Sequence, residues 1–104
     1  MIKFDAVYDT DGKILQFVVE GHSGYAESGA DIVCASVSSA VWMTINGIEK
    51  QNLAVLSYEE HDGFVKCIIT DKKSVGADIL LKSLVMFIKE LSGQYGDFLK
   101  FTQC

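Results

Sequence analysis

A histidine and a cysteine border the most glycine-rich segment of the chain and could form a base and a nucleophile. His22 precedes this segment and Cys34 follows it, with Asp31 three residues before the cysteine. Asp31 is a typical N-cap, so a helix that begins at Ile32 places Cys34 in the first helical turn. There the free backbone N–H groups and the helix dipole favour a thiolate, and they could also donate to a developing oxyanion. The spacing therefore predicts an activated thiol nucleophile.

The loop from Gly21 to Ala30 must bring His22 back to Cys34, and its composition permits this. It contains Gly21, Gly24 and Gly29, which allow the positive φ angles that a chain reversal needs. We expect the loop to be mobile and to order around an extended peptide. Tyr25 would then either cover the peptide or anchor the loop.

Ser38 lies one helical turn after Cys34 on the same helix face. Its hydroxyl could form a hydrogen bond near the sulfur, or equally to a backbone carbonyl of its own helix.

The other thiols and the second histidine are less suited to catalysis. Cys67 alternates with Val65 and Ile69 along a strand, which indicates an inert core position, and Cys104 ends the chain. His61 lies beside an Asp-Gly turn, which favours the surface. Three cysteines without short spacing argue against a disulfide framework and a zinc site, so we expect no metal or cofactor.

The elements that position these residues follow the order ββα-ββα-β. Hydrophobic alternation and Asp-Gly turn signals predict strands at residues 2–8, 14–20, 53–59, 64–70 and 98–102, and helical periodicity predicts helices at 32–50 and 75–92. The second helix carries a broad apolar stripe that includes Ile79, Leu84 and Phe87. This pattern predicts one α+β domain over residues 1–104, with a mainly antiparallel sheet packed against two helices.

The composition is that of a folded protein, with 49% hydrophobic and 22% charged residues. The net charge is −5 and the nine lysines are dispersed, which argues against a nucleic-acid partner but allows a basic protein partner. Residues 1–5 do not resemble a secretory signal, and no apolar run is long enough to suggest a membrane span. We therefore expect a cytoplasmic protein.

The first predicted helix is apolar nearly all round, with no charged residue between Asp31 and Glu49. Such a helix must be covered on most of its sides. One sheet in a chain of this length covers only part of it, so we expect a homodimer in which a second copy covers the rest.

The sequence resembles the ribosomal-processing cysteine protease (Prp) family over nearly its whole length. The matching residues are Gly21-His22, Gly24-Tyr25-Ala26, Gly29, Asp31-Ile32-Val33-Cys34-Ala35 and Val37-Ser38. The resemblance implies that His22 and Cys34 form a catalytic dyad with Asp31 and Ser38 as supporting residues. It also implies a homodimer and a glycine-rich loop that orders around substrate.

The substrate implied by the resemblance is the precursor of the twenty-seventh large-subunit ribosomal protein, from which a short N-terminal extension is removed. The chain departs from the family pattern at Ser23 and Ser36, where small alanine is common.

Two other functions fit the same residues. The chain could be a non-catalytic, ribosome-associated module that binds the same basic protein during assembly, or a redox sensor that uses the Cys34 thiol. Selective alkylation of Cys34 near neutral pH would distinguish a protease or a sensor from a binding module, and peptide cleavage would distinguish the protease from the sensor.

Overall fold

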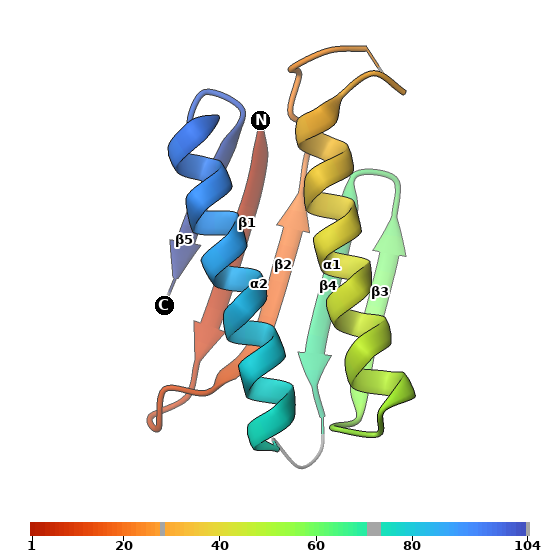
Figure 1. The fold of residues 1–104 in the computed structure, drawn as a ribbon, viewed down its shortest axis with the longest axis vertical. Helices are drawn as coiled ribbons and strands as arrows, with labels where there is room; N and C mark the ends of the chain where they lie inside the picture. The colour runs from red at the N-terminus through yellow and green to blue at the C-terminus, as the bar shows by residue number, and fades with distance from the viewer. Residues whose placement is uncertain (28, 71–73, 104) are drawn as a thin grey trace.

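Five strands form one sheet, and both helices lie on the same face of it (Figure 1). The computed structural model describes residues 1–27, 29–70 and 74–103. The elements are β1 (Ile2–Tyr8), β2 (Ile14–Glu20), α1 (Ile32–Lys50), β3 (Leu56–His61), β4 (Phe64–Ile69), α2 (Val75–Gln94) and β5 (Leu99–Gln103). The predicted fold class and element order are confirmed.

The strand order across the sheet is β3-β4-β2-β1-β5. All neighbouring pairs are antiparallel except β1 and β5, which run parallel with Ile2 opposite Leu99. The two hairpins, β1–β2 and β3–β4, therefore meet at β2 and β4, where Glu20 pairs with Phe64. This pairing brings the end of β2, just before His22, next to the β3–β4 turn.

The core lies between the sheet and the helices. Alternate residues of the strands point into it, including Phe4 and Phe17, whose rings stack with their centroids 5.5 Å apart. From α1, the residues Val33, Val37, Val41, Ile45 and Ile48 are buried against the sheet. The far face of the sheet carries residues such as Lys3 and Lys66, as expected for an antiparallel sheet with one solvated face.

The start of β3 was predicted three residues too early, at residue 53, whereas the strand begins at Leu56. The reason is the way in which α1 ends. Asn52 has a φ of 54°, and the Leu53 N–H donates to the Ile48 carbonyl at 3.0 Å. This is the Schellman pattern that closes a helix, and it uses residues that look like a strand start in the sequence.

The apolar stripe predicted for α2 is only partly buried. Leu84 is in the core, but Ile79 is 59% exposed and Phe87 is 40% exposed. The face that packs on the sheet instead includes Ala77, Leu81 and Val85. The exposed apolar residues of α2 therefore lie outside the core of one chain.

Among the described residues, α1 is the one helix that is long and apolar enough to cross a membrane, by length and composition alone. The core helix of a small domain meets the same criteria, and α1 has one face buried against the sheet.

Candidate active site

The candidate site is built around the N-terminus of α1, where Asp31 caps the helix as predicted. One carboxylate oxygen, Oδ1, accepts from the backbone N–H groups of Val33 at 3.0 Å and Cys34 at 2.9 Å. The other, Oδ2, accepts from the Ser23 hydroxyl in a short hydrogen bond. The Ser23 hydroxyl and then the Cys34 amide lower the pKa of Asp31 to about 2. Asp31 is therefore an ionised anchor for both the helix and the preceding loop.

Ser23 joins the loop to the nucleophile candidate. Its side chain bonds Asp31, and its own backbone N–H donates to the Cys34 sulfur at 3.3 Å. The residue is only 3% exposed, although it belongs to a polar loop. This contact holds the loop against the Cys34 sulfur. Sequence reasoning identified Ser23 only as a departure from the family pattern, because its contacts are to residues eight and eleven positions away.

The expectation that first-turn amides of α1 are open to an oxyanion is wrong for three of them. The N–H groups of Val33 and Cys34 donate to the Asp31 side chain, and that of Ala35 donates to the Asp31 carbonyl at 3.1 Å. These donors are already used inside the helix cap.

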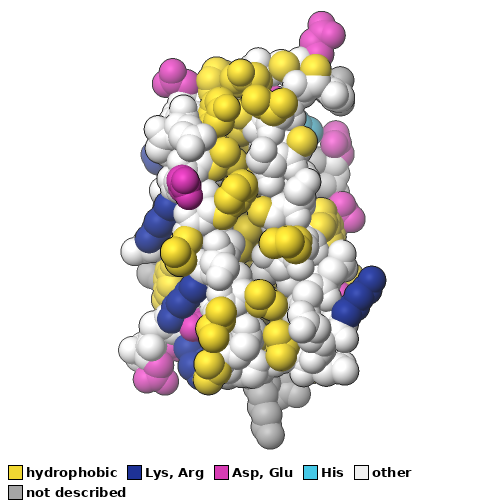
Figure 2. All heavy atoms as spheres, in the orientation of Figure 1, with side chains coloured by type: hydrophobic (Ala, Val, Ile, Leu, Met, Phe, Trp, Pro, Cys, Tyr) yellow, Lys and Arg dark blue, Asp and Glu magenta, His cyan; other side chains and the backbone are white. Residues whose placement is uncertain are grey.

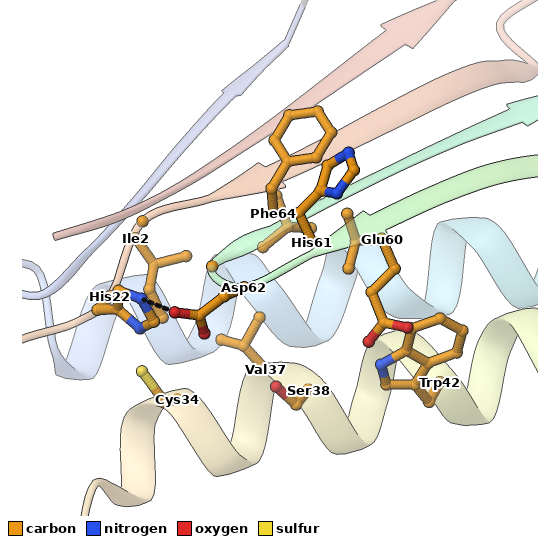
Figure 3. A pocket seen from close by; sticks show the side chains of 14 residues that line it. Ile2, His22, Cys34, Val37, Ser38, Trp42, Glu60, His61, Asp62 and Phe64 are labelled. Carbon is orange, nitrogen blue, oxygen red and sulfur yellow. Dashed lines mark ion pairs between the residues drawn. The ribbon is translucent and has the colours of Figure 1, made fainter. Parts of the chain in front are cut away.

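His22 follows β2 and is held in place by the segments on either side of it. The Gly21 N–H donates to the Gly63 carbonyl at 2.8 Å, and the His22 carbonyl accepts from the Met1 amine at 2.6 Å. The ring packs so closely on the β3–β4 turn that a Cβ added at Gly63 would lie 2.8 Å from Nε2. Figure 3 shows the imidazole facing the Cys34 sulfur, with both residues lining one cleft.

Asp62, in the β3–β4 turn, is the carboxylate next to the imidazole. Its Oδ2 lies 3.9 Å from His22 Nε2, and the side chains are 99% and 64% exposed, respectively. An ion pair this long and this exposed contributes little by itself in water. In the sequence this residue is marked only as part of a turn, because nothing local indicates that the turn lies against His22. Asp31, by contrast, bonds the loop and the helix cap.

The cleft beside Cys34 has a volume of about 470 Å³. It runs along α1 past Ser38 to Trp42, with the end of the β3–β4 hairpin as its other wall (Figure 3). Ser38 is exposed on the α1 wall of the cleft, one helical turn from Cys34. The structure therefore brings Gly21, His22, Cys34 and Ser38 to one cleft. Asp31 contributes by holding the helix N-terminus and Ser23 together.

Tyr25 packs as a loop anchor in this structure. Its ring meets those of Tyr95 and Phe98 edge-on, with centroids 5.6 and 5.2 Å away. Gly24 and Gly29 border a second hollow that also includes His22 and Cys34, and both have positive φ angles, 74° and 90°.

The residues set aside in the sequence either lie in the core or turn their side chains away from Cys34, although His61 is among the residues that line the cleft. Cys67 is fully buried, and burial, followed by the charge of Glu49, raises the pKa of its thiol to about 12. The His61 side chain bonds Glu59 at 2.8 Å and points away from Cys34 in Figure 3. Cys104 lies outside the described residues. No group of three or more His, Cys, Asp or Glu suited to a metal occurs within the described ranges.

Comparisons with known proteins agree with this geometry. A family model described as cysteine protease Prp matches residues 1–100. A Staphylococcus aureus protein named ribosomal processing cysteine protease Prp is 24% identical over 102 residues, which cover 93% of each chain. The solved structure of the S. aureus protease with a covalently linked product peptide has a TM-score of 0.95 at 22% identity, with both chains covered completely. A second, with a substrate peptide, has a TM-score of 0.89 at 21% identity over the same coverage.

Proposed function

The chain belongs to the cysteine protease Prp family and is a cysteine protease, and from this premise we propose that Cys34 is its nucleophile and His22 its general base. The observation that carries the proposal is the surroundings of the Cys34 sulfur. It lies at a helix N-terminus, accepts the Ser23 N–H at 3.3 Å and faces the His22 imidazole across an open cleft. Of the two cysteines in the described residues, only this one has a base and access for a peptide.

The reaction follows from these positions. His22 accepts the thiol proton, and the Cys34 sulfur attacks the scissile carbonyl carbon to form a tetrahedral intermediate. As the C–N bond breaks, the protonated imidazole gives its proton to the leaving amine, and a thioester remains. His22 then takes a proton from water, whose oxygen attacks the thioester carbonyl. The acid product leaves and the sulfur recovers its proton through His22.

We assign Asp31 and Ser38 supporting roles. The Asp31 carboxylate holds the Ser23 hydroxyl and the Cys34 amide, so it fixes the sulfur relative to the loop. Ser38 lies one turn farther along the cleft wall, where its hydroxyl can meet the backbone of a bound peptide. Gly21, Gly24, Tyr25 and Gly29 belong to the loop that we expect to order around this peptide.

The proposed substrate is the precursor of the twenty-seventh large-subunit ribosomal protein, cut to remove its N-terminal extension. The S. aureus relative is named a ribosomal processing protease, and its structures contain a substrate peptide and a covalently linked product peptide. A peptide substrate suits the elongated cleft along α1. Membership in a protease family favours cleavage over the binding-module and redox-sensor functions.

The test is cleavage of a peptide that spans the processing site of this precursor. Cys34→Ala should abolish cleavage while the protein stays folded, and His22→Ala should reduce kcat/KM by at least about 100-fold, the usual contribution of an acid–base group. The controls are His61→Ala and Cys67→Ala, which alter residues of the same types: the His61 ring points away from Cys34, and Cys67 is buried in the core. Turnover at the wild-type rate by Cys34→Ala would refute the nucleophile assignment.

We further propose a cytoplasmic homodimer with no nucleic-acid or membrane partner and no metal. Support for the dimer comes from the outward faces of the helices, where Met43 is 74% exposed and Phe87 is 40% exposed. Hydrophobic side chains lie along the groove between α1 and α2 in Figure 2, over a hollow of about 740 Å³. The dispersed lysines support the absence of a nucleic-acid partner.

A further inference from the structure

The far end of the active-site cleft differs in chemistry from the end at Cys34. Trp42 lies two helical turns beyond Cys34 on α1, and its ring meets Tyr58 of β3 edge-on, with centroids 5.7 Å apart. Trp42 is half-buried and lines the cleft, and Tyr58, which is 44% exposed, extends this aromatic surface just beyond the cleft lining. Val37 and Val65 add apolar surface between this pair and the sulfur.

One carboxylate, that of Glu60, lies beside this aromatic surface. Glu60 follows Tyr58 by two residues on β3, so its side chain is on the same face of the sheet. Figure 3 shows it beside the Trp42 ring, inside the cleft lining. Among the described residues, no lysine forms an ion pair with it. The neighbouring Glu59 is different, because it lies on the other face and bonds His61 at 2.8 Å.

We propose that Trp42, Tyr58 and Glu60 form a specificity subsite for a lysine or arginine side chain of the substrate. The aliphatic stem of such a side chain would lie on the two rings, and its cationic head would reach the Glu60 carboxylate. Asp62 adds a second negative charge at the same wall of the cleft. No basic residue is among those that line the cleft apart from the histidines, so an acidic side chain would find no partner there.

The position of the basic residue in the substrate follows from the helix. Trp42 is eight residues after Cys34, a rise of about 12 Å along the axis. An extended peptide advances about 3.3 Å per residue. The recognised side chain is therefore about three to four residues from the scissile bond. This subsite rests on the proposed function, since it would bind a side chain of the peptide that Cys34 cleaves.

The experiment uses the precursor peptide of the cleavage test. The residue at each of about five positions on either side of the scissile bond is replaced by Lys in one peptide and by Glu in another. Five residues of extended peptide are longer than the distance from Cys34 to Trp42. In the wild-type enzyme, kcat/KM should favour Lys by about fivefold or more at one position three or four residues from the bond, the upper range for an exposed ion pair. In Glu60→Gln this ratio should fall to about one, and in Glu60→Lys it should invert.

Glu59→Gln is the matched control, because it removes the same charge from the adjacent residue on the opposite face of β3. It should retain the wild-type ratio. A ratio that Glu60→Gln leaves unchanged, or that Glu59→Gln lowers equally, would overturn the subsite.

Failure of the proposed function is recognised separately. If the wild-type enzyme cleaves no peptide, that function is refuted, and the subsite is decided by peptide binding to Cys34→Ala protein measured by fluorescence anisotropy. Tighter binding of the Lys peptide that disappears when Glu60→Gln is added would support the subsite. Equal binding of the Lys and Glu peptides at every position would overturn it.

Discussion

At the residue scale, the site depends on a serine that the sequence does not mark as functional. Ser23 donates its hydroxyl to Asp31 and its backbone N–H to the Cys34 sulfur. Asp31 in turn holds the Cys34 amide, so the three residues form a closed set of contacts between loop and helix. The position of the sulfur relative to the loop therefore depends on a single carboxylate.

Ser23→Ala should destabilise the protein in a pH-dependent way. In the folded protein the pKa of Asp31 is lowered from its usual 3.8 to about 2, and the Ser23 hydroxyl is the largest cause of the lowering. A lowered folded pKa contributes stability above the unfolded value, and this stability is lost as the pH falls through about 4 towards 2. The difference in melting temperature between wild type and Ser23→Ala should therefore be largest at neutral pH and shrink below about pH 4.

Ser36→Ala is the control for this measurement. The Ser36 hydroxyl donates to the Ile32 carbonyl at 2.7 Å and does not contact a titrating group. Its effect on the melting temperature should not vary between neutral pH and about pH 3. A Ser23→Ala difference that also stays constant over this range would contradict the role given to the Asp31 carboxylate.

At the scale of elements, the β3–β4 turn packs against His22, the candidate catalytic histidine, and holds its ring in place. Gly63 has a φ of 69°, and its missing side chain leaves room for the His22 ring. The pairing of Glu20 with Phe64 and the Gly21–Gly63 hydrogen bond keep this turn against the end of β2. The position of the imidazole is thus set by a hairpin forty residues away in sequence.

Gly63→Ala should reduce kcat/KM by at least about tenfold in peptide cleavage, since displacing a catalytic group by about 1 Å is costly. The new Cβ would lie 2.8 Å from His22 Nε2, so the ring must move. The matched control is Gly12→Ala in the β1–β2 turn, where φ is also positive, at 80°, but nothing lies within 4 Å. Both variants should lose about 1–2 kcal/mol of stability from the strained φ, and only Gly63→Ala should lose activity. Equal activities would show that the turn does not position His22.

The sequence predicted the parts of the site whose contacts are local. Asp31 caps the helix through contacts within one turn, so the cap can be recognised in the sequence and Cys34 lies in the expected first turn. Ser23 and the Asp62–Gly63 turn could not be found in this way, because strand pairing and loop folding bring them to the site from distant positions. The β3 start was wrong for a related reason, because the hydrogen bond from Leu53 to Ile48 is a helix-ending contact that hydrophobic alternation does not report.

At the scale of the whole molecule, the two helices form a layer with one face on the sheet and one face open. The open face is apolar over the groove between α1 and α2, to which Ile32, Met43, Leu80 and Phe87 contribute. The candidate active-site cleft opens on the other side of α1, between this helix and the β3–β4 hairpin. A second copy could therefore cover the groove and leave the peptide cleft free.

Met43→Glu should weaken the proposed dimer. Met43 lines the groove and is 74% exposed, so a charge there would be buried against the second copy without a partner. Light scattering should give twice 11.4 kDa for the wild type at micromolar concentration, with a dissociation constant at least about tenfold higher for Met43→Glu. Met86→Glu is the matched control, since Met86 is 69% exposed on α2 but does not line the groove. A wild-type mass of 11.4 kDa would refute the dimer, and equal weakening by both variants would move the interface away from the groove.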